Sequence, residues 1–122
     1  MDKLISKYYD GYEGEPEIQF IKDSNKGDRI ILSIWDGFFD DIMTQFKPTD
    51  SGWKGLAYYY NLVTGWEEDI WEIPNIKFAL LEFQDLRTSQ FRFSESAEVL
   101  SVICDLLKSA IEEKQKIWIS KE

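Results

Sequence analysis

The sequence predicts a small α+β domain with an N-terminal β-hairpin, several helices and a long C-terminal helix followed by a short strand. Residues 17–22 alternate between polar and apolar side chains, and residues 29–35, beyond a turn, are rich in β-branched residues, which is typical of paired strands. Three later segments carry apolar residues at three- and four-residue spacing, which is typical of amphipathic helices. The chain has 122 residues, of which 43% are hydrophobic, so residues 1–122 are expected to form a single domain around one core.

The predicted hairpin follows an irregular start. Residues 1–15 begin with a short amphipathic piece and continue into a loop, because two glycines and Pro16 interrupt regular structure there. Residues 17–22 alternate polar and apolar side chains and predict the first strand. A turn over residues 23–28 leads to residues 29–35, whose β-branched side chains favour the second strand.

Helical spacing then dominates the middle of the chain. Residues 37–46 predict a short helix with Asp36 as its N-cap. Residues 51–64 fit a strand and a helix comparably well, and a helix is favoured. After Pro74, apolar positions in residues 76–86 again recur at helical spacing and predict another helix.

The clearest predicted helix lies near the C-terminus. Residues 95–114 carry acids in the first turn and lysines near the end, as the helix dipole prefers, and Ser94 is the expected N-cap. Cys104 falls within the apolar pattern of this helix, so it is predicted to be a small buried residue, with a reactive thiol as the alternative. Residues 91–93 suggest a short extended segment, and residues 116–120 alternate like a final strand.

Composition and charge exclude several classes of function. The chain has 23 Asp and Glu against 14 Lys and Arg, a formal charge of −9, which repels nucleic acid and anionic membrane and favours a basic partner. It has no histidine, so the commonest general acid–base and metal ligand is missing. No apolar run approaches the roughly 18 residues that cross a bilayer, and the N-terminus has no signal-peptide pattern, so a soluble cytoplasmic protein is expected.

The acidic tract, residues 65–74, is the most informative feature of the sequence. It places four carboxylates between two tryptophans, inside residues 55–76, which contain no Lys or Arg. Tryptophan supplies a large contact area and uncompensated carboxylates project a negative field, so the tract is predicted to bind a basic partner. Its predicted contact residues are Trp66, Glu67, Glu68, Asp69, Trp71 and Glu72. A second interpretation buries both tryptophans in the core and leaves the acids in a solvated loop.

Other acidic and aromatic residues are candidates for the same contact. Asp40 and Asp41 lie together in the first predicted helix, and residues 10–17 combine acids with tyrosine in a second stretch without Lys or Arg. Tyr59 is the middle of three consecutive tyrosines, which cannot all point inward from one element, and tyrosine is enriched at protein interfaces.

The carboxylates do not have the spacing of a catalytic or metal site. Neither the acidic tract nor the cluster of Asp36, Asp40 and Asp41 matches a calcium loop, which needs alternating ligands and a glycine at the sharp turn. No pair is picked out as the protonated and ionised acids of a glycosidase. The sequence therefore predicts a protein that is not an enzyme and has no cofactor or metal, and a small carboxylate-dependent enzyme is the third alternative.

Residues 58–62, Tyr-Tyr-Tyr-Asn-Leu, and residues 65–73, Gly-Trp-Glu-Glu-Asp-Ile-Trp-Glu-Ile, resemble segments of bacterial immunity proteins of contact-dependent growth inhibition and related polymorphic toxin systems. The resemblance extends over residues 54–120. It implies a cognate partner, the C-terminal toxin domain of a large delivered protein and often a basic nuclease, which the immunity protein binds tightly and inhibits. The family has no catalytic residues to transfer.

A non-catalytic adaptor is the second alternative, and it includes an acidic mimic of nucleic acid. A mimic would spread its charge along an elongated face, whereas lysines interrupt the acids of this chain at several positions. A broad acidic and aromatic surface would favour a binding protein, and a perturbed carboxylate in a closed pocket would favour an enzyme.

Overall fold

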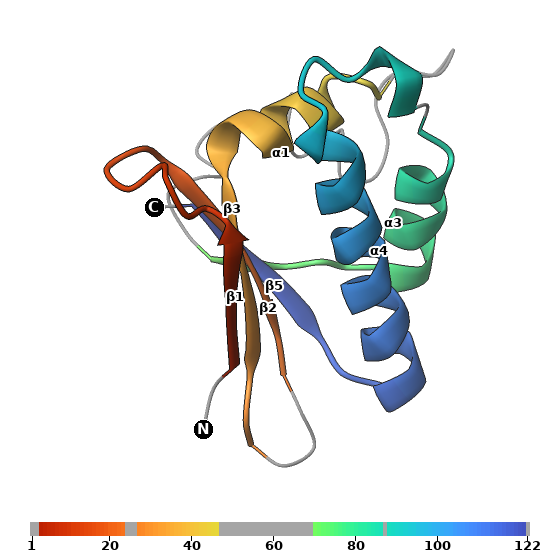
Figure 1. The fold of residues 1–122 in the computed structure, drawn as a ribbon. Helices are drawn as coiled ribbons and strands as arrows, with labels where there is room; N and C mark the ends of the chain where they lie inside the picture. The colour runs from red at the N-terminus through yellow and green to blue at the C-terminus, as the bar shows by residue number, and fades with distance from the viewer. Residues whose placement is uncertain (1–2, 24–26, 47–69, 87, 122) are drawn as a thin grey trace.

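The computed structural model describes residues 3–23, 27–46, 70–86 and 88–121. Within these residues, the α-helices lie on one face of a five-stranded sheet (Figure 1). The elements in chain order are β1 (Lys3–Tyr8), β2 (Glu17–Lys22), β3 (Ile30–Trp35), α1 (Asp36–Met43), β4 (Trp71–Glu72), α3 (Ile76–Gln84), the 3-10 helix η1 (Thr88–Gln90), α4 (Glu95–Glu113) and β5 (Ile117–Lys121).

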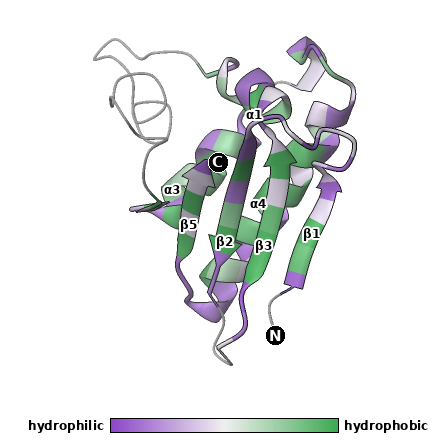
Figure 2. Cartoon of the chain, turned by 90° about the vertical axis from the view of Figure 1, so that its left-hand side faces the viewer, coloured by the Kyte–Doolittle hydropathy of each residue, from purple (hydrophilic) through white to green (hydrophobic). Residues whose placement is uncertain are grey.

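The sheet is mixed in direction. Its strand order is β1-β3-β2-β5-β4, so β1 forms one edge and the two-residue strand β4 forms the other. β1 runs parallel to β3, whereas β2 is antiparallel to both β3 and β5, and β4 is antiparallel to β5. The face opposite the helices carries no described helix (Figure 2), and we call it the open face.

The core lies between the sheet and the helices. Because side chains alternate along a strand, one face of each strand points toward the helices. On that face, Ile18 lies opposite Ile34, and Phe20 lies opposite Leu32; all four are fully buried. Helix α4 supplies a matching apolar stripe at helical spacing. The members of this stripe that are 0% exposed are Val99, Ile103, Leu107 and Ala110.

The structure confirms a small α+β domain and most of the predicted elements. Strands β2 and β3 are adjacent and antiparallel, as a hairpin requires. Helix α3 begins at the expected place, where the Asn75 side chain accepts a 3.0 Å hydrogen bond from the Phe78 N–H. Helix α4 ends at Glu113, because the C-cap residue Lys114 has a positive φ of 56°, and β5 follows as predicted.

Several predictions at element ends are wrong. Residues 3–8 form a strand, where the sequence predicts only a short amphipathic piece before a loop; the partner of this strand, β3, lies far along the chain. Asp36 is the first residue of α1 and not its cap; Trp35 occupies the N-cap position without a side-chain hydrogen bond. Residues 91–93 are not a strand but follow η1 directly. Ser94 occupies the N-cap of α4 as predicted, although its side chain makes no capping hydrogen bond.

Two further predictions concern the interior of the chain. Cys104 is buried, as predicted, and burial raises the pKa of its thiol, which disfavours the reactive thiolate. The helix predicted over residues 51–64 lies outside the described residues.

Candidate partner-binding surface

One end of the sheet gathers acidic side chains. The loop between β1 and β2, the junction of β3 with α1, and the C-terminal end of β5 meet there (Figure 1). We call residues 9–16 the acidic loop and this end of the sheet the acidic end. The acids placed there are Asp10, Glu13, Glu15, Glu17 and Asp36.

Hydrogen bonds within the acidic loop fix its shape. The Tyr9 hydroxyl donates to the Glu15 carbonyl oxygen at 2.7 Å, and the Gly11 N–H donates to the two Glu13 carboxylate oxygens at 3.0 and 3.2 Å. Gly11 and Gly14 both have a φ of +94°, a conformation that side chains disfavour. The N–H groups of Glu13 itself and of Gly11 lower the pKa of the Glu13 carboxyl. The carboxylates are therefore presented on an ordered backbone.

Aromatic stacking ties the acidic loop to the core. The ring of Tyr12 stacks on Trp35 with 4.3 Å between centroids and 9° between planes. Tyr12 also meets Phe38 edge-on at 5.6 Å, and Trp35 meets Phe93 at 5.4 Å. Such contacts contribute beyond the burial of apolar area, so the loop is anchored at its centre.

The acids of the loop differ from the other acids at this end in their ionic partners. Asp36 lies 3.7 Å from the Lys121 ammonium. Asp10, Glu13 and Glu15 are exposed, and none of them forms an ion pair with a Lys or Arg of the described segments. Within the described segments, their negative field is therefore not compensated by an ion pair.

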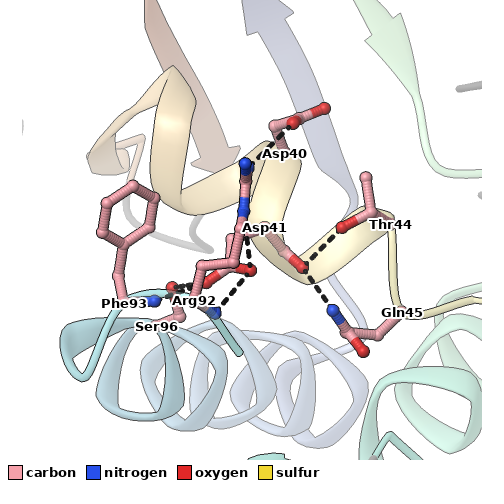
Figure 3. Close-up of polar contacts among 7 residues, drawn as sticks. All are labelled: Asp40, Asp41, Thr44, Gln45, Arg92, Phe93 and Ser96. Atoms are coloured by element: carbon pink, nitrogen blue, oxygen red, sulfur yellow. Dashed lines mark hydrogen bonds and ion pairs between the residues drawn. The ribbon is translucent and has the colours of Figure 1, made fainter. Parts of the chain in front are cut away.

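Asp41, which the sequence predicts to face a partner, lies inside the protein with 0% of its surface exposed. One of its carboxylate oxygens accepts a 3.0 Å hydrogen bond from the Arg92 N–H (Figure 3). The other accepts hydrogen bonds from the Phe93 N–H at 3.0 Å and the Ser96 hydroxyl at 2.7 Å. The role of Asp41 is therefore corrected: it joins α1 to the turn that starts α4.

The charge of Asp41 is stabilised despite its position. Burial opposes ionisation, but the hydrogen bonds from Arg92, Ser96 and Phe93, with the positive charge of Arg92, lower the pKa of the Asp41 carboxyl below its usual value. Its neighbour Asp40 stays half-buried at the surface, 3.5 Å from the Arg92 guanidinium. Of the two predicted contact residues, only Asp40 is accessible to a partner.

Four of the six predicted contact residues of the acidic tract lie outside the described residues, as does Tyr59. The tract residues concerned are Trp66, Glu67, Glu68 and Asp69. The remaining two form β4, with Trp71 opposite Ile119 and Glu72 opposite Trp118. Glu72 is half-buried, and its carboxylate lies 3.8 Å from the Lys116 ammonium. Lys116 thus compensates part of the negative charge of the acidic tract. The sequence did not indicate this, because residues 55–76 contain no Lys or Arg.

The chain enters β4 from the acidic end. Trp71 lies opposite Ile119, and two residues later the Ile73 N–H donates to the Ile117 carbonyl oxygen at 2.9 Å. Ile70, which is 53% exposed, therefore lies on the side of β4 toward the acidic end. The described end of the acidic tract and the acidic loop are thus connected to the same end of the sheet.

The described segments contain no group of three or more His, Cys, Asp or Glu side chains that could hold a metal ion. Among the helices of these segments, none is long and apolar enough to cross a bilayer. Comparison with models of protein families, with curated proteins and with solved structures found no match.

Proposed function

We propose that this protein is an immunity protein, which binds a basic toxin domain and neutralises it by occupying its surface. The observation that carries the proposal is the acidic loop. It holds three exposed carboxylates on a hydrogen-bonded, aromatically anchored backbone, and no cation of the described segments pairs with them.

Charge supports this role through the rate of association. At a formal charge of −9, the protein attracts a basic partner, and complementary fields accelerate encounter by orders of magnitude at low salt. A nuclease lines its site with Lys and Arg that hold phosphates. Carboxylates offered in place of phosphates would compete for those side chains.

The order of the acidic loop supports the affinity of the complex. A flexible acidic segment loses conformational entropy when it binds, and a preorganised one loses less. In the acidic loop, the hydrogen bond from Tyr9 to Glu15 and the stacking of Tyr12 on Trp35 impose this order before any partner arrives. Inhibition by this protein then requires no chemical step, only a tight complex.

The test begins with co-expression of this chain and the toxin domain encoded immediately upstream of it in the source genome. Rescue of growth and a complex recovered in a pull-down are expected. No rescue and no complex, with both proteins folded, would contradict the proposal for that pair.

A matched pair of variants then tests the acidic loop. The loop variant carries Asp10→Asn, Glu13→Gln and Glu15→Gln, and the control neutralises three exposed acids of the helical layer. The control substitutions are Asp85→Asn, Asp105→Asn and Glu112→Gln. Because both variants lose three negative charges, a specific role predicts a larger fall in association rate and a weaker salt dependence for the loop variant alone.

A further inference from the structure

A continuous row of side chains crosses the open face of the sheet. Leu4 pairs with Ile31, Ile31 with Ile21, Ile21 with Trp118, and Trp118 with Glu72. These residues are direct cross-strand neighbours, so their side chains share one face. We call them the apolar row. Across the five strands the row spans about 19 Å, at a strand spacing of about 4.8 Å.

The apolar row is accessible at its ends and packed at its centre. Leu4 is 59% exposed, Ile31 and Trp118 are half-buried, and Ile21 is buried between them at 6% exposure. No described helix lies over this face (Figure 2). An exposed apolar surface bordered by polar side chains is typical of a protein–protein contact.

The side chains between the apolar row and the acidic end are polar. The next row toward that end is Ser33, Gln19 and Ser120. Ser33 and Gln19 both donate hydrogen bonds to the Glu17 carboxylate, which lies one step nearer the acidic end. The open face therefore changes from apolar to polar to acidic along the strands.

We propose that the apolar row is the docking surface for the same basic domain, with the acidic end as its charged rim. This inference rests on the proposed function. Along strand β2, Ile21 in the apolar row lies four residues, about 14 Å, from Glu17 at the acidic end. A standard interface of about 800 Å² on each partner covers that distance. Apolar centre and charged rim are the usual arrangement of such an interface.

Charge decides which occupant fits this face. A second copy of the chain would bring another −9 charge against the acidic end, and like charges at an interface oppose association. A basic domain meets the acidic end favourably while its apolar side chains cover Leu4, Ile31 and Trp118. The apolar row also ends at Glu72, the last acid of the acidic tract.

The test uses the double variant Leu4→Gln with Ile31→Thr, which removes apolar surface without changing charge and retains β-branching at position 31. The matched control is Leu81→Gln on α3, since Leu81 is 64% exposed on the helical layer. The probe is the upstream-encoded toxin domain. The double variant is expected to weaken the complex at least tenfold with an unchanged salt dependence, and the control less than twofold.

Each contrary outcome identifies what failed. If the unaltered chain binds no toxin domain, the proposed function fails, and this inference fails with it. If it binds and the double variant binds equally well, only the docking surface is wrong. If the free chain is a dimer that the double variant dissociates, a second copy is the occupant. If Leu4→Gln lowers the melting temperature much more than Leu81→Gln does, the chain itself covers the row.

Discussion

The buried carboxylate of Asp41 and the exposed carboxylates of the acidic loop are the same chemical group in opposite surroundings. Asp41 has 0% exposure and accepts hydrogen bonds from Arg92, Phe93 and Ser96. The loop acid Asp10 is exposed, and it has no ion-pair partner in the described part of the chain. The first stabilises the fold, and the second leaves its charge available to another molecule.

This difference shows how an acidic protein can divide its charges between structure and binding. A buried carboxylate must accept hydrogen bonds within the protein, and its oxygens are then no longer available to a partner. An exposed carboxylate contributes little to stability but keeps its field in solvent. Substitutions at the two kinds of site should therefore change different properties of the protein.

The largest effect is expected from Asp41→Ala. The substitution leaves the Arg92 and Phe93 N–H groups and the buried Ser96 hydroxyl without their acceptor, so the free energy of unfolding should fall by about 3 kcal/mol. Chemical denaturation would measure the loss. If Asp41→Ala prevents folding, Asp41→Asn keeps the shape and should give a smaller loss in the same direction.

The control for Asp41 is its neighbour. Asp40→Ala removes a carboxylate that is 41% exposed and paired with Arg92 at 3.5 Å, so it should cost less than about 1 kcal/mol. Equal losses for Asp40 and Asp41 would contradict the assignment of a structural role to Asp41 alone.

A second buried charge extends the comparison to a cation. Lys22 is 2% exposed, and its ammonium donates to the Glu113 carboxylate at 2.7 Å and to the Ser109 hydroxyl at 3.1 Å. Glu113→Ala leaves this ammonium without its counter-charge and should cost about 2 kcal/mol, below the range of a fully buried pair because Glu113 is 42% exposed. Lys22→Met removes charge and keeps the apolar stem, so its loss should be smaller. Denaturation would measure both losses. A larger loss for Lys22→Met than for Glu113→Ala would contradict the view that Lys22 is stabilised mainly by its ion pair with Glu113.

The stability of the protein should depend on pH through Asp41. Its folded-state pKa is lowered, so its contribution is present above the unfolded pKa of about 3.9 and is lost as pH falls through the folded value. The free energy of unfolding should therefore decrease on acidification, and less steeply in Asp41→Asn. Glu98 and Glu13 also have lowered pKa values. Both residues are present in the unaltered protein and in Asp41→Asn, so their contributions cancel when the two pH profiles are subtracted. Parallel curves for the two proteins would contradict this prediction.

The sequence predicted those parts of the fold that depend on local pattern. Helices α3 and α4 and strands β2, β3 and β5 each extend over five or more residues with a local sequence pattern. The cap of α3 is also local, because the Asn75 side chain accepts its hydrogen bond from the N–H of Phe78, three residues later. Strand β1 depends on pairing with a strand some 27 residues later, Lys3 with Ile30. Such non-local pairing cannot be derived from the spacing within the segment itself.

The site was predicted less well, because burial of a charge depends on distant residues. Asp41 receives its hydrogen bonds from residues 51 to 55 positions away. The spacing of apolar residues does not separate the two acids of α1. Asp41 lies three residues after Phe38 and beside Ile42, and Asp40 lies three residues before Met43 and beside Phe39. Asp41 is the buried one because of its contacts with residues 92–96, which the pattern within α1 does not contain. The loop acids were only a secondary candidate in the sequence.

The smallest effect on stability is expected from substitutions in the acidic loop, although their effect on binding is expected to be large. Asp10→Asn, Glu13→Gln and Glu15→Gln act on exposed groups, so each should leave the free energy of unfolding nearly unchanged. The Glu13 carboxylate accepts a hydrogen bond from the Gly11 N–H at 3.0 Å, and the side-chain oxygen of glutamine can still accept it. Denaturation of the triple variant beside the unaltered protein would measure the change. A loss as large as that of Asp41→Ala would mean that the acidic loop is needed for the fold, and the comparison between structural and binding carboxylates would then fail.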